Sequence, residues 1–137
     1  MSYLKKKSDI LCGAASFLHQ EEYYPAVAHS AYYSCLQLNK HIWLHVLGKT
    51  EGDLEEECAK QKKGSHEVLI NTARNYIRES AKENSIEHAR TFFSKIGQLK
   101  RLRVDADYED VVFGERDSEN SIALSKSLLP LLKKYAT

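Results

Sequence analysis

The sequence predicts an all-α protein, folded as an antiparallel up-and-down bundle of four to five helices. Three observations support this prediction. Apolar residues recur at helical spacing along most of the chain, runs of β-branched residues are scarce, and only two prolines occur. The chain has 137 residues, which is enough for one core, so we expect a single domain over residues 1–137.

The first two helices are expected to end near Gln20 and at Gly48. An apolar stripe at helical spacing defines the first of them, comprising Leu4, Leu11, Ala14, Ala15 and Leu18. Pro25 suits the first turn of the second helix, and Gly48 suits its end. This second segment is apolar on most sides, which predicts that it is the central and most buried helix.

The middle of the chain is expected to form a surface connection followed by a third main helix. Residues 49–64 are polar and contain two glycines, which indicates a connection, with at most one short helix inside it. Ser65 is placed to cap the helix predicted over residues 66–81.

Two further helices complete the expected bundle. Asn84 followed by Glu87 resembles a capping box and predicts the start of the fourth main helix, which Gly114 is expected to end. Its apolar stripe comprises Ile86, Ala89, Phe92, Phe93, Ile96, Leu99, Leu102 and Ala106. The last helix is expected over residues 118–136, with Pro130 kinking or limiting it.

Composition narrows the classes of function. The net charge of +1 argues against a broad basic field for nonspecific nucleic-acid binding and leaves a local basic patch open. The three cysteines are odd in number and far apart, which argues against a disulfide framework or a zinc knuckle and favours a cytoplasmic protein. The first twenty residues read as a helix rather than a signal peptide, and no apolar run reaches the length of a membrane span. We expect no cofactor and no membrane partner.

The stretch "RLRVDADYED" (residues 101–110) departs from an ordinary core helix. Arg103 follows Leu99 by four residues and therefore lies on or beside the core-facing stripe. Asp107 and Asp110 follow it at helical spacing, so we expect Arg103 to be mostly buried and paired with a carboxylate or another polar group. Two interpretations remain open: helix-surface ion pairs with an interfacial tyrosine, or a polar site in a cleft where a guanidinium meets a phosphate or a carboxylate.

Arg101 lies elsewhere on the same helix. Asp105 follows it by four residues, and Tyr108 by seven, so both are placed near its face. This spacing predicts an ion pair with Asp105 and a cation close to the Tyr108 hydroxyl.

Three segments in order, "YYPAVAHSAYYSCLQLNK", "KGSHEVLI" and "LKRLRVDADYED", resemble the HEPN domain family, in particular its small stand-alone bacterial and archaeal members. The resemblance covers roughly residues 8–135. It implies a compact helical bundle that usually dimerises and is often encoded beside a minimal nucleotidyltransferase. Many members are metal-independent ribonucleases of toxin–antitoxin or defence systems.

The resemblance also assigns roles to residues. The nuclease motif of the family places Arg101 at its arginine, Ala106 at its histidine and Tyr108 at its tyrosine, while Arg103 matches the arginine of the "R..ADY" subgroup. Because alanine cannot transfer a proton, this pattern implies RNA or nucleotide binding without the usual catalytic histidine. The binding residues are then Arg101, Arg103, Asp107 and Tyr108. Tyr108 is also the candidate for nucleotide attachment by the nucleotidyltransferase.

Two alternatives remain. The chain could be a metal-independent endoribonuclease that uses Arg101 or Arg103 with His66 as the proton-transfer group, or a purely structural interaction module. His41 and His45 have the spacing of two metal ligands but no evident third ligand, so no metal site is predicted. We expect a homodimer with the fourth main helix at its two-fold interface.

Overall fold

The structure is a computed structural model, and it describes residues 2–137. Within these residues it contains six α-helices and one turn of π-helix, and no strand. The elements are α1 (Tyr3–Gln20), α2 (Tyr24–His41), η1 (Ile42–Val46), α3 (Glu51–Gln61), α4 (Ser65–Glu79), α5 (Ser85–Tyr108) and α6 (Glu115–Tyr135). The all-α prediction is therefore confirmed, although the described part of the chain has one helix more than the four to five expected.

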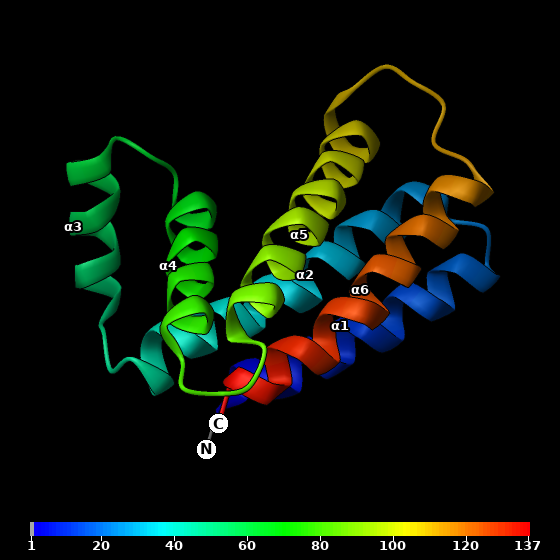
Figure 1. The fold of residues 1–137 in the computed structure, drawn as a ribbon. Helices are drawn as coiled ribbons and strands as arrows, with labels where there is room; N and C mark the ends of the chain where they lie inside the picture. The colour runs from blue at the N-terminus through cyan, green and yellow to red at the C-terminus, as the bar shows by residue number, and fades with distance from the viewer. Residues whose placement is uncertain (1) are drawn as a thin grey trace.

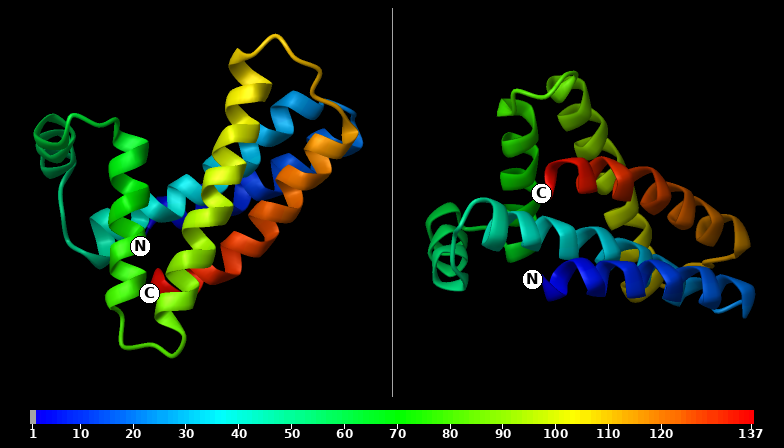
Figure 2. Two further views of the ribbon diagram at one scale, coloured as in Figure 1. Left: turned by 45° about the horizontal axis from the view of Figure 1, so that its top comes forward. Right: turned by 90° about the horizontal axis from the view of Figure 1, so that it is seen from below.

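The helices form two groups. α1, α2 and α6 lie side by side in one layer, and α4 and α5 form an antiparallel pair that stands across it (Figures 1 and 2). α3 packs on the outer side of α4. The bundle is thus not a simple up-and-down arrangement, because the α4–α5 pair crosses the other helices instead of continuing their direction.

The core is built around α2, as the sequence predicts. α2 contacts α1, α4, α5 and α6, and its buried residues include Val27, Ala31, Tyr32, Cys35 and Leu38. Burial raises the pKa of the Cys35 thiol to about 12, so this thiol stays protonated at neutral pH. All three cysteines are free.

The helix ends differ from the sequence predictions in physical detail. α3 forms in the polar connection because Thr50 and Asp53 make a capping box, in which each side chain accepts from the other's backbone N–H. Ser65 does not cap α4 but is its first residue, and Asn84 precedes α5 without a side-chain capping bond. The capping predictions for these two residues are therefore wrong.

The last two helices also begin and end in other places than expected. α5 ends at Tyr108, whereas Gly114 precedes α6 and donates its N–H to Asp117 Oδ2 at 3.1 Å. α6 continues through Pro130 to Tyr135, so Pro130 does not end it. A proline inside a helix removes one backbone hydrogen bond. Burial of Leu128, Leu129 and Leu132 around it offsets that loss.

His41 joins the two ends of the described chain. Its Nε2 donates to the carbonyl oxygen of Ala136 at 2.8 Å, and its Nδ1 lies 2.7 Å from Ser2 Oγ. Burial is the main cause of the lowered pKa of His41. The hydrogen bond to Ala136 raises this pKa, and the nearby Lys5 and His45 lower it further. The folded state therefore favours the neutral imidazole.

We predict that acidification destabilises the fold through His41. The folded-state pKa lies below the unfolded value of about 6.5, so below about pH 6.5 the unfolded chain binds the proton first and the free energy of unfolding falls. Above that pH, His41 is neutral in both the folded and the unfolded chain, and its full contribution to stability is present. Urea denaturation measures the free energy of unfolding at about pH 7.5 and at about pH 5.5. The decrease between the two pH values should be smaller in His41→Gln than in the parent chain. Equal losses in the two proteins would contradict this role.

Candidate functional site

The most unusual buried group is the guanidinium of Arg103. The buried face of α5 consists of Ala89, Phe92, Ile96, Leu99 and Arg103, so the arginine continues the apolar stripe. Arg103 is 8% exposed. The prediction that it lies on the core-facing side of its helix and is mostly buried is confirmed.

Three tyrosines surround this guanidinium. Its central carbon lies 5.0, 5.7 and 5.6 Å from the ring centroids of Tyr32, Tyr33 and Tyr108, respectively. At these distances each ring attracts the cation through its negative face. The rings of Tyr32 and Tyr33 meet edge to face with centroids 5.3 Å apart, which fixes both beneath the arginine.

Asp107 provides the counter-charge. Its Oδ2 lies 3.5 Å from Arg103 Nη1 and 3.1 Å from Nδ1 of His29 on α2. The predicted pairing of Arg103 with Asp107 is therefore confirmed, whereas Asp110 makes no ion pair within residues 2–137. Arg103 Nε is buried without a hydrogen-bond partner, so the guanidinium keeps donor capacity that the described residues leave unused.

His66 belongs to the same cluster. Its Nδ1 is 3.1 Å from the hydroxyl of Tyr32, and its ring meets Tyr33 edge to face. Burial lowers the pKa of His66, with Arg103 and Lys100 adding to the effect. Burial likewise raises the pKa of Tyr32, against the effect of the Arg103 charge. The His66 imidazole and the Tyr32 hydroxyl are therefore neutral at pH 7. The rings of Tyr32 and Tyr33 contact His66 as well as Arg103, and so connect the two.

The cluster is open to solvent on two sides. Tyr108, the last residue of α5, is 71% exposed, although its ring lies against Arg103. On the other side, Tyr33 and His66 line a groove of about 540 Å³ between α2, α3 and α4. Lys40 and Glu51, which pair at 2.8 Å, also line this groove.

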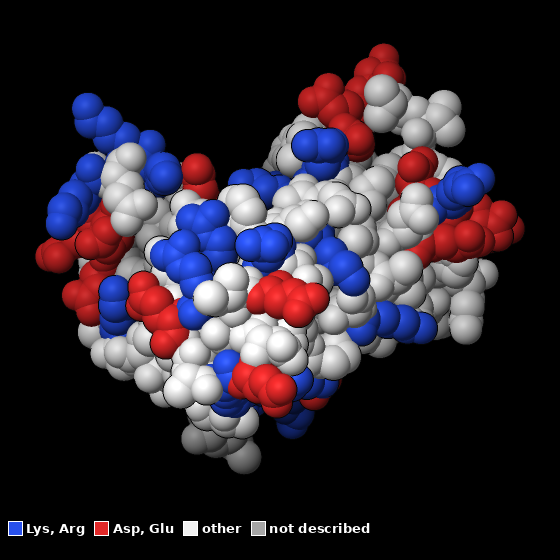
Figure 3. Space-filling model, viewed as in Figure 1, with Lys and Arg blue, Asp and Glu red and all other residues white. Residues whose placement is uncertain are grey.

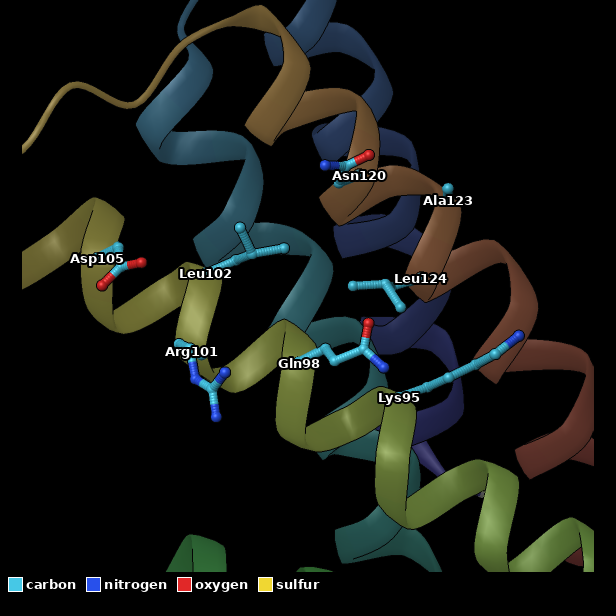
Figure 4. A pocket seen from close by; sticks show the side chains of 8 residues that line it. All are labelled: Lys95, Gln98, Arg101, Leu102, Asp105, Asn120, Ala123 and Leu124. Carbon is cyan, nitrogen blue, oxygen red and sulfur yellow. The ribbon is translucent and has the colours of Figure 1, made fainter.

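The structure separates Arg101 from Arg103. Arg101 is exposed and lines a shallow groove between α5 and α6, where Figure 4 shows its guanidinium directed away from Asp105 and Leu124. Within residues 2–137 it makes no ion pair with Asp105, so that predicted pair is wrong. The guanidinium that lies over the Tyr108 ring is that of Arg103.

The sequence patterns described above single out neither Tyr32 and Tyr33 nor His29, although all three belong to the cluster. Tyr32 is fully buried, and its hydroxyl is bonded to His66. A buried arginine requires partners on the helix that faces it. The tyrosine pair on the most buried helix is the sequence feature that could have indicated these partners. His29 precedes Tyr33 by one helical turn, and the two rings are tilted by 40° with their centroids 4.7 Å apart.

The spacing of His41 and His45 does not produce a metal site. Their rings stack with centroids 5.2 Å apart, and both nitrogens of His41 are engaged by Ser2 and Ala136. A ligand nitrogen must carry a free lone pair, which this arrangement denies to His41.

Comparison with protein-family models, with curated proteins and with solved structures finds no match to this chain. Among residues 2–137, no helix combines the length and the apolar character that a membrane span requires.

Proposed function

We propose that this chain is a HEPN-like protein that binds RNA or nucleotides through the Arg103 cluster. The observation that supports this most is a buried guanidinium lying against the ring of the exposed Tyr108. A base can stack on the free face of such a tyrosine, while the positive charges of Arg103 and Lys100 favour the neighbouring phosphate. The site is small and the chain's net charge is only +1, so binding should depend on this cluster.

Binding without efficient cleavage is the favoured form of the proposal. Ala106 stands where the nuclease motif of the HEPN family has its histidine, and alanine cannot act as an acid or a base. Arg103 and Lys100 can attract a phosphate, and Tyr108 can stack on a base. These are binding functions.

The test is fluorescence anisotropy with short labelled single-stranded RNAs and with nucleotides. Arg103→Met keeps most of the aliphatic part of the side chain and removes the charge, so we expect affinity to fall about tenfold or more. Arg116→Met, an exposed arginine on α6, is the matched control and should bind like the parent chain. A larger loss in Arg101→Met than in Arg103→Met would move the site to the α5–α6 groove.

A metal-independent endoribonuclease is the second candidate function, and the contact of His66 with Tyr32 favours it. A neutral His66 can accept the proton of a ribose 2′-hydroxyl as it attacks phosphorus, while the 5′-oxygen leaves. Cleavage in the presence of a chelator, lost in His66→Gln, would establish this function. If the chain neither binds nor cleaves RNA or nucleotides, the interpretation as a structural interaction module is favoured.

The proposal includes partners. We propose a cytoplasmic homodimer that acts with a minimal nucleotidyltransferase in a toxin–antitoxin or defence-type system, with α5 at the two-fold interface. A monomer in light scattering at micromolar concentration would contradict the dimer.

Tyr108 is the candidate acceptor for nucleotide attachment. It is exposed, and its hydroxyl has no hydrogen bond within residues 2–137. Arg103 can neutralise an incoming phosphate. We predict that, on co-expression with a nucleotidyltransferase encoded beside the chain, the Tyr108 hydroxyl attacks the α-phosphorus of a nucleoside triphosphate and releases pyrophosphate. Intact-mass spectrometry should then show one added nucleotide in the parent protein and none in Tyr108→Phe. An adduct that persists in Tyr108→Phe would exclude this residue.

A further inference from the structure

Three side chains with metal-binding groups converge where α1 ends and α6 begins, at one end of the three-helix layer (Figure 1). They are His19, Glu115 and Glu119. One imidazole nitrogen and one oxygen of each carboxylate lie within 4.8 Å of one another. None of the three belongs to the Arg103 cluster.

The local structure explains this convergence. Glu115 and Glu119 are four residues apart in α6 and therefore share one face of the helix. His19 lies in the last turn of α1, and its Nδ1 is 2.7 Å from Oγ of Ser118, which is fully buried. This contact with a fixed hydroxyl orients the ring and leaves Nε2 as the free nitrogen.

The two carboxylates have no ion-pair partner among the described residues. Within residues 2–137, no side-chain nitrogen of a lysine or arginine lies within 4.0 Å of a carboxylate oxygen of Glu115 or Glu119, and Figure 3 shows acidic side chains gathered where α6 begins. The ring of Tyr24 lies 5.6 Å from that of His19. The site therefore presents two carboxylates that form no ion pair with the described residues, beside an oriented imidazole.

We propose that His19, Glu115 and Glu119 bind a divalent transition-metal ion, and that Zn²⁺ is the ion they suit best. One imidazole and two carboxylates are a donor set that zinc accepts, with three protein ligands and water in the remaining position. Mg²⁺ and Ca²⁺ prefer oxygen ligands alone, so the imidazole selects against them. Ser118 then acts as the outer partner that accepts a hydrogen bond from Nδ1–H.

The ligand atoms need to move only slightly to bind the ion. Around a tetrahedral zinc ion, neighbouring ligand atoms are about 3.3 Å apart, which follows from metal–ligand distances of about 2.0–2.1 Å. Both glutamates are exposed, so their side chains can rotate inward without disturbing the core. The bound ion would connect the end of α1 to the start of α6.

The experiment is a calorimetric titration of the full-length, chelator-treated protein with ZnCl₂, together with thermal melting. We expect one zinc ion per chain and a higher melting temperature with zinc. His19→Gln and Glu119→Gln should each weaken zinc binding at least tenfold, and Ser118→Ala should weaken it about tenfold. The matched controls are the exposed His45→Gln and Glu56→Gln, which should bind zinc like the parent chain.

Three results would overturn the proposal. The first is the absence of zinc binding in the parent chain. The second is unchanged binding in His19→Gln, since every variant keeps the three free cysteines and thiol binding would survive there. The third is a magnesium affinity equal to that for zinc, which would indicate an acidic cluster without a role for the imidazole. Circular dichroism of the metal-free variants shows whether each remains folded.

Discussion

Replacing Arg103 with alanine is expected to lower the free energy of unfolding by about 2–3 kcal/mol. The substitution removes the contacts of the guanidinium with three aromatic rings and the packing of the aliphatic part of the side chain. The ion pair with Asp107 adds less, because the Asp107 side chain is 24% exposed and solvent screens the attraction. Urea denaturation followed by circular dichroism measures the change.

Two variants separate charge from packing in this prediction. Arg103→Met keeps most of the packing and removes the buried Nε that has no partner, so it should cost less than alanine. Arg101→Ala, on the exposed side of the same helix, should change stability by no more than about 0.5 kcal/mol. If Arg103→Ala were as mild as Arg101→Ala, the guanidinium would be unimportant for the fold.

Trp43→Ala should have the largest effect of all, a loss of about 3–5 kcal/mol. Trp43 is the only tryptophan of the chain, is 1% exposed, and packs in the core from the π-helical turn η1. Its Nε1 donates to the carbonyl oxygen of Thr50 at 2.9 Å, next to the start of α3. Alanine leaves a cavity and also removes the hydrogen bond that holds Thr50, the residue before α3.

The control for this prediction is Phe17→Ala. Phe17 lies on α1 and is 60% exposed, so its loss should cost less than about 1 kcal/mol. Trp43→Phe should fall between the two, because it retains an aromatic ring and loses the bond to Thr50. Thermal melting followed by circular dichroism is the suitable measurement, since it does not rely on tryptophan fluorescence. Equal stabilities of Trp43→Ala and Phe17→Ala would contradict the central place of Trp43.

The sequence was informative wherever burial follows periodicity. The apolar positions of α2 predicted its burial, and the place of Arg103 four residues after Leu99 predicted that of the arginine. The predicted stripe of α5 is wrong at Ile86 and Phe93, which are 62% and 43% exposed because the buried face of this helix is narrower than its run of apolar residues. Helix ends were harder to predict, because a cap depends on backbone angles. Asn84 has a capping side chain, yet its positive φ of 62° turns that side chain away from the bond it would make.

Contacts between distant segments were not predictable from spacing. Arg101 and Arg103 are two residues apart but face different grooves, because α5 packs against α2 and α4 on one side and α6 on another. His19 and Ser118 are 99 positions apart in the chain, and no local pattern connects them. The crossing of the α4–α5 pair over the helix layer brings His66 to Tyr32, and helix prediction alone does not give crossing geometry.

The weak attachment of α3 has a consequence for how the groove beside His66 opens. Leu54 is the only residue of α3 that is buried, so this helix should unfold locally at a lower free energy than the rest of the protein. Its backbone amides should then exchange with deuterium well before those of α2. Because Glu51, Glu55 and Cys58 form one wall of that groove, a ligand there would slow the exchange of α3 as it binds.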